Sequence, residues 1–165
     1  MKLKRPIITA GAFGALALNG MSFAFVGTSL PALRAFMSIN VELAASLMAI
    51  FQAGFTLFTL TGGLLSDHIR RERVLLLGSL LLAMGAVLLG HWTVYCANLL
   101  IFLCLGMGAG LVLSGSNALL VGLYPNQKGL ILNIHHVFFG LGSLVGPLIM
   151  GRLLSVGEWL RGYQG

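Results

Sequence analysis

Residues 98–123 read NLLIFLCLGMGAGLVLSGSNALLVGL and contain no Asp, Glu, Lys or Arg. About 20 apolar residues in a helix cross the roughly 30 Å hydrocarbon core of a bilayer, so this stretch is long enough to span one. Its backbone N–H and C=O groups would find no water there, and an α-helix pairs them within a single segment. The stretch therefore predicts a transmembrane helix.

The rest of the chain has the same apolar character. Hydrophobic residues make up 58% of the 165 residues and charged residues 8%, and the mean hydropathy is +0.97. Soluble domains carry about a quarter charged residues, so this chain has too few to cover a water-facing surface. We therefore predict an all-α integral membrane protein that is embedded in the lipid bilayer.

Five apolar stretches alternate with short polar segments. The predicted spans cover residues of about 7–30, 43–66, 74–91, 98–123 and 130–150. Pro31 is expected to mark the end of the first helix, because proline lacks the backbone N–H that a helix interior uses. Residues 157–165 look like the start of a sixth span that the chain does not complete.

The basic residues indicate the orientation of the chain. With five spans, seven of them lie on one side of the membrane: Lys2, Lys4, Arg5, Arg70, Arg71, Arg73 and Lys128. Three lie on the other side: Arg34, Arg152 and Arg161. By the positive-inside rule, the N-terminus and the loop 67–73 are cytoplasmic, in a multi-pass protein of the plasma or inner cell membrane. The net charge of +6 is then a topology signal, and no nucleic-acid partner is expected.

The cysteines, histidines and acids argue against a metal site or an enzyme. Cys96 and Cys104 form neither a CxxC pair nor a metal-ligand set. His135 and His136 are adjacent, so they project about 100° apart on a helix and chelate a metal poorly. The spans hold no carboxylate pair, no Ser/His/Asp set and no HExxH motif. We expect no cofactor, no metal and no catalytic residue.

Residues 63–73, GLLSDHIRRER, resemble a transporter motif. The loop between the second and third helices of the major facilitator superfamily has the pattern G-x-L-x-D-R-x-G-R-K. Four positions match it: Gly63, Leu65, Asp67 and Arg71. Three depart from it: His68, Arg70 and Glu72. The resemblance implies that Gly63, Asp67 and Arg71 latch two halves of a transporter together at the cytoplasmic face, while a solvated loop that only sets topology is the simpler alternative.

Residues 142–151, GSLVGPLIMG, are similar to the fifth-helix pattern G-x-x-x-G-P-x-x-G-G of the same superfamily, and only Met150 departs from it. The spacing of Gly142 and Gly146 is typical of helices that pack closely, and Pro147 is expected to bend this span. The two motifs imply about five transmembrane helices of a major facilitator N-terminal six-helix bundle. Residues 1–165 would then form one partial N-terminal bundle.

Residues 132–142, LNIHHVFFGLG, are similar to the L-N-x-x-H-x-x-F-G-x-G stretch of fucose permease-like sugar transporters. Such relatives often carry an acid in helix four, where this chain has Leu113 or Ser114. The superfamily's helix-four arginine position falls on Phe102. These departures argue against proton coupling through this half.

Polar side chains inside the spans are the candidates for solute contacts. Five are selected: Asn19, Gln52, Asn117, Asn133 and His136. No carboxylate lies within a span, so the lining favours a neutral, sugar-like solute over a cation. Asn133 and His136 share a helix face, whereas His135 points elsewhere on that helix. Hydrogen bonds between neighbouring helices would explain these residues equally well.

The resemblance implies secondary active transport of a small solute, with symport as the mode and alternating access between two six-helix halves as the mechanism. A chain of about five helices is expected to need a missing C-terminal transporter half and not to transport alone. Two alternatives remain open at this point. One is a small homo-oligomeric membrane pore or carrier, and the other is a truncated fragment without function.

Overall fold

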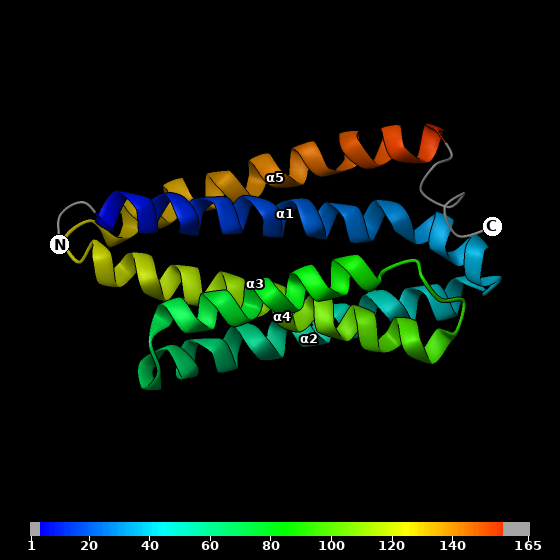
Figure 1. Cartoon of the computed structure of the whole chain (residues 1–165), viewed down its shortest axis with the longest axis horizontal. Coiled ribbons are helices and arrows are strands. Elements are labelled where there is room, and N and C mark those ends of the chain that lie inside the picture. Colours follow the sequence, from blue (N-terminus) through cyan, green and yellow to red (C-terminus); the bar gives the residue numbers. More distant parts are fainter. Residues whose placement is uncertain (1–3, 157–165) are drawn as a thin grey trace.

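A computed structural model describes residues 4–156 of the chain, so the predicted start of a sixth span at 157–165 lies outside the described residues. The described chain forms five α-helices (Figure 1). They are α1 (Lys4–Met37), α2 (Val41–His68), α3 (Arg71–Leu88), α4 (Tyr95–Leu123) and α5 (Lys128–Val156). The all-α fold class predicted from the sequence is confirmed.

Four of the described helices, α1, α2, α4 and α5, are long and apolar enough to cross a membrane. The remaining helix, α3, has 18 residues and begins with the charged sequence Arg71, Glu72, Arg73. Its apolar portion is therefore shorter than in the other four. The membrane crossing of α3, and with it the count of five spans, stays a prediction.

The helix end predicted at Pro31 is wrong. Pro31 lies inside α1, which continues to Met37. Proline removes one backbone donor, and a long helix held by tertiary contacts can continue past that loss. The chain reverses instead at Ser38, whose φ of 53° is in the left-handed region. Asn40 then caps the N-terminus of α2, because its side-chain oxygen accepts a hydrogen bond of 2.9 Å from the Leu43 N–H.

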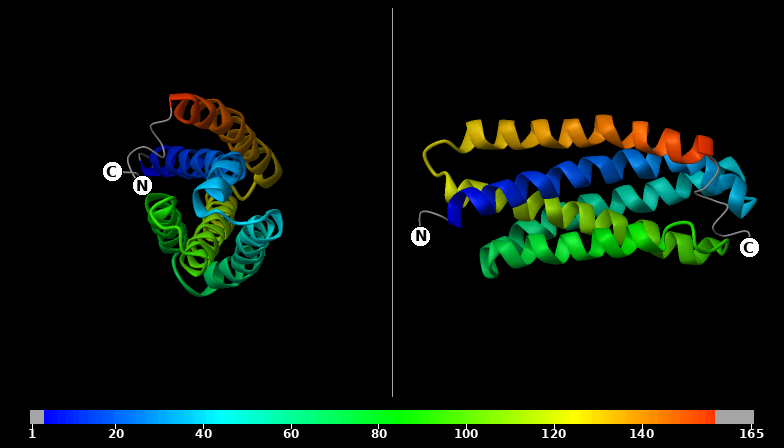
Figure 2. Two further views of the ribbon diagram at one scale, coloured as in Figure 1. Left: turned by 90° about the vertical axis from the view of Figure 1, so that its right-hand side faces the viewer. Right: turned by 45° about the horizontal axis from the view of Figure 1, so that its top comes forward.

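The five helices form two packed groups that meet along α1 and α4. In one group α1 lies against α5, and in the other α2 and α3 both lie against α4 (Figure 2). By contrast, α2 and α3 contact each other little, although they are consecutive in the sequence. The central position of α4 explains why it is the most buried of the helices.

Glycines allow the backbones of α2 and α4 to approach closely. A Cβ atom on Gly106 would lie 2.1 Å from the Phe51 carbonyl oxygen, and one on Gly110 would lie 2.5 Å from the Phe55 carbonyl oxygen. Both distances are far below van der Waals contact, so only glycine fits at these two positions of α4. Close approach through small residues is the usual way in which membrane helices pack.

Candidate functional site

A buried polar junction joins α1, α4 and α5 through the side chain of His135 (α5). Its Nδ1 atom lies 3.1 Å from Oδ1 of Asn117 on α4, and its Nε2 atom lies 3.2 Å from the carbonyl oxygen of Ala12 on α1. The imidazole is fully buried and stacks on the ring of Phe13, with 5.6 Å between the ring centroids. Both ring nitrogens therefore have partners, and they belong to two different helices.

The burial pattern of α5 explains why His135 lies in this junction. The buried residues of this helix in the described range are Ile131, His135, Gly142, Gly146 and Met150. Spacings of four and seven residues place them on one helix face, the face that packs against α1. His136 is one residue further along and is exposed. Sequence reasoning preferred His136, although the seven-residue distance from His135 to Gly142 was a usable signal for His135.

The five residues selected from the sequence as solute contacts have different surroundings. Gln52 on α2, and Asn133 and His136 on α5, are exposed. Asn117 is partly buried and bonds His135, while Asn19 is fully buried. Among the described residues, no hydrogen bond joins any two of these five. Within the described part of the chain, Asn117 is thus hydrogen-bonded to His135 and to none of the other four.

Asn19 lies at the contact between the two helix groups. Its Nδ2 atom donates a hydrogen bond of 3.0 Å to the carbonyl oxygen of Ala109 on α4. Its Oδ1 atom is buried and has no hydrogen-bond partner within the described part of the chain. An unsatisfied buried acceptor is costly, so a hydrogen-bond donor at this oxygen would be stabilising.

An aromatic cluster joins α1 to α2 and α5. The ring of Phe23 (α1) meets the rings of Phe51 and Phe55 on α2 edge-on, with centroid distances of 4.8 and 4.9 Å. It also meets Phe139 on α5 at 5.7 Å. Edge-to-face geometry is favourable for such pairs, and the Phe23 ring therefore stabilises the contacts of α1 with both α2 and α5.

Two arginines lie at the C-terminal end of α4, where backbone carbonyls are left without helical partners. Arg5 (α1) donates a hydrogen bond to the Leu123 carbonyl and stacks over the Tyr124 ring, 4.1 Å from its centroid. The guanidinium of Arg71 (α3) occupies the space beside Gly122, where a Cβ atom would lie 1.8 Å from its Nη1 atom. Both cations are favourably placed at the negative end of the helix dipole.

The residues selected as a latch also differ from one another. Asp67 is exposed near the end of α2, and Gly63 has open space in the direction that a Cβ atom would take. Arg71 contacts α4 of its own bundle. Arg70 and Glu72 form an exposed ion pair, with 3.6 Å between Nε and Oε2. The pair contributes little to stability because water screens it.

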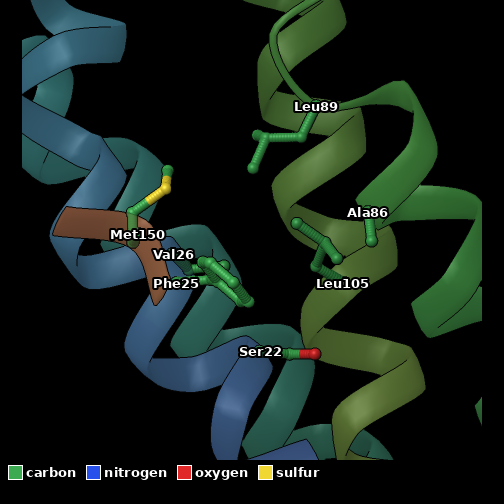
Figure 3. A pocket seen from close by; sticks show the side chains of 7 residues that line it. All are labelled: Ser22, Phe25, Val26, Ala86, Leu89, Leu105 and Met150. Carbon is green, nitrogen blue, oxygen red and sulfur yellow. The ribbon is translucent and has the colours of Figure 1, made fainter. Parts of the chain in front are cut away.

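A groove lies between α1 and α3, with Val112 of α4 also in its lining. A cavity of about 230 Å³ at one end of it is lined by seven residues (Figure 3): Ser22, Phe25, Val26, Ala86, Leu89, Leu105 and Met150. The Ser22 hydroxyl donates to the Leu18 carbonyl of its own helix. The lining is otherwise apolar, so a hydroxyl-rich solute would find few partners here. This groove is therefore a poor candidate for the solute site.

Long apolar helices that pack through glycines, with buried polar groups bonded across helix interfaces, define the chain as a multi-pass α-helical membrane protein. The chain belongs to the Major Facilitator Superfamily, whose family model matches residues 12–162. The family predicted from the two motifs is thereby confirmed. Membership also agrees with the expectation that the chain is not an enzyme.

Comparison with curated proteins gives one relative with a sugar transporter's name. The chain is 27% identical over 134 residues to sodium-dependent glucose transporter 1A of Mus musculus. The match covers 79% of this chain and 31% of that relative, so the chain spans less than a third of the relative's length. No solved structure matches the chain significantly.

Proposed function

We propose that this chain forms the N-terminal part of a secondary active transporter that moves a small, neutral, sugar-like solute across a membrane by alternating access. The observation that carries the proposal is the junction of His135, Asn117 and Ala12, which places neutral hydrogen-bonding groups at the meeting point of three helices in a member of this superfamily. The name of the mouse relative supports a sugar as solute and symport with sodium as the mode.

Asn117 is the principal solute contact in this proposal, since its amide is partly exposed beside the junction. Asn19 contributes the buried Oδ1 atom that lacks a partner among the described residues. Gln52, Asn133 and His136 contribute from exposed faces of α2 and α5. In this view the solute reaches the α1–α4 contact from the side on which α2 and α5 flank it.

The second half of the transporter would pack against the faces that this bundle leaves open. Gly63 and Asp67 are accessible for a latch at the cytoplasmic end, and Arg71 (α3) supports the latch through its contact with α4. Gly142, Gly146 and Pro147 belong to α5, which would move together with α1. The N-terminus would face the cytoplasm, in the plasma or inner cell membrane.

A chimera tests the proposal directly. The segment of the mouse relative that aligns with this chain is replaced by the corresponding residues of this chain, and uptake of labelled D-glucose into proteoliposomes is measured with and without a sodium gradient. We expect saturable uptake by the chimera, its loss in Asn117→Ala, and no uptake by the 165-residue chain alone. A chimera that inserts correctly and transports no sugar, or saturable uptake by the chain alone, would contradict the proposal.

A further inference from the structure

The hydrogen-bond partners of His135 restrict the protonation of its ring. The carbonyl oxygen of Ala12 can only accept a hydrogen bond, so the Nε2 atom, 3.2 Å away, must carry a proton. A neutral imidazole has a single N–H group. In the neutral ring Nδ1 is therefore a bare acceptor, and it needs a donor from Asn117.

A doubly protonated ring is the alternative, and its surroundings disfavour it. The ring is fully buried, and its partners are the neutral Ala12 carbonyl and the neutral Asn117 amide. His136, with its ring centroid 5.9 Å away, is the nearby titratable group that the described contacts show, and it would add repulsion when charged. A buried cation without a compensating charge is costly, so the neutral ring is favoured.

The neutral ring determines the orientation of the Asn117 amide. An asparagine amide has a donor end and an acceptor end, and a rotation of 180° exchanges them. No other described group hydrogen-bonds this amide. Its NH2 group therefore turns toward Nδ1 of His135, and Oδ1 takes the opposite, partly exposed position.

We propose that His135 is a positioning residue for solute recognition, which holds the NH2 group of Asn117 and so leaves the Asn117 oxygen as an acceptor for a solute hydroxyl. The inference rests on the proposed function, in which Asn117 contacts the solute. It assigns a role to a residue whose two ring nitrogens both have partners within the bundle, so that neither is free for a solute. It also predicts that the solute group bound by the Asn117 oxygen is a hydrogen-bond donor and not an acceptor.

The protonation of His135 is measurable on the 165-residue chain in lipid nanodiscs without any solute. Two-bond ¹⁵N–¹H spectra of ¹⁵N-histidine-labelled protein distinguish the two neutral tautomers from the charged ring, and the loss of one signal set in His135→Gln assigns it. We expect the Nε2–H tautomer at pH 7. An Nδ1–H tautomer or a doubly protonated ring would overturn the inference.

The side-chain amide of Asn117 provides the second readout. We expect its NH2 protons to show a hydrogen-bond coupling to Nδ1 of His135, which His135→Gln abolishes and the control His68→Gln, at the exposed end of α2, leaves intact. Asn117→Asp, which presents only acceptors to Nδ1, should shift the His135 ring to its doubly protonated spectrum. If the NH2 signals of Asn117 do not change in His135→Gln, the inference is refuted. If the tautomer is the expected one but the chimera shows no uptake, only the proposed function is refuted.

Discussion

Gly142 of α5 and Ala17 of α1 approach so closely that a Cβ atom on Gly142 would lie 1.9 Å from the Ala17 carbonyl oxygen. The approach is reciprocal, because a Cβ atom on Gly20 would lie 2.1 Å from the Phe139 carbonyl oxygen. Two helices that are far apart in the sequence are thus in direct backbone contact. This contact keeps His135, two turns earlier on α5, within reach of Ala12.

Gly142→Val should force α1 and α5 apart. Overpacking of a tight contact typically costs about 1–3 kcal/mol, and the backbone carbonyl at this contact has little freedom to move. Gly140→Val is the matched control, since a Cβ atom on Gly140 meets nothing within 4 Å. Thermal unfolding of the purified variants in one detergent measures the difference. Equal midpoints for the two variants would contradict the close contact.

Tyr124 should show a graded response to substitution. Its hydroxyl lies 3.0 Å from the Thr9 hydroxyl, and its ring lies under the Arg5 guanidinium. Tyr124→Phe removes only the hydrogen bond, which is worth about 0.5–1.5 kcal/mol. Tyr124→Leu also removes the cation–π contact, which adds about 0.5–1 kcal/mol at a partly exposed site. Chemical denaturation in detergent should rank the stabilities as wild type, Tyr124→Phe, Tyr124→Leu, and an equal loss in both variants would exclude a role for the ring.

Asn19→Asp and Asn19→Leu should differ strongly in stability. The aspartate places a carboxylate in a fully buried position beside the Ala109 carbonyl, where it is either charged without a partner or must take up a proton. The leucine removes one hydrogen bond and, with it, the unpartnered Oδ1 atom, so we expect a loss of no more than about 1 kcal/mol. Unfolding midpoints of the two variants measure the difference. Comparable midpoints would show that this position is hydrated.

The orientation of the chain is testable with reporters. Fusion of a cytoplasm-active reporter after Ile69, between α2 and α3, should give signal, and fusion after Trp92, between α3 and α4, should not, since the basic residues favour cytoplasmic loops. Equal signal from both fusions would mean that α3 does not cross the membrane. The fusion after Trp92 is informative because α3 carries three charges in its first turn.

The existence of the helices followed from the sequence, because long stretches without charge have few alternatives in a bilayer. The end of α1 did not, since proline lowers the stability of a helix without fixing where it ends, and contacts in the fold decide. The central position of α4 in the bundle could not be predicted from the sequence either. Apolar side chains surround this helix on every side, so no periodic pattern indicates which of its faces contact other helices.

Only part of the candidate site could be predicted from the sequence. Asn117 was selected because it is polar within an apolar span, and the structure places it in the buried junction. His135 was passed over because its helix face was judged from Asn133 and His136, which are exposed. Gly142 and Gly146 lie on the packed face of α5, and counting back from Gly142 would have selected His135 instead. In this apolar helix, the pair of glycines four residues apart indicates the buried side better than the polar residues do.

The pairing of α2 and α3 with α4, rather than with each other, has a consequence for biogenesis. While the ribosome has delivered only the first three helices, α2 and α3 still lack their main partner, and α1 lacks α5. The early helices therefore remain unassembled in the lipid or at the insertion machinery. Their final assembly begins only after α4 has left the ribosome. Truncating the nascent chain before Tyr95 should leave a set of helices that membrane chaperones retain, whereas truncating it after Leu123 should release a protease-resistant core of α2, α3 and α4.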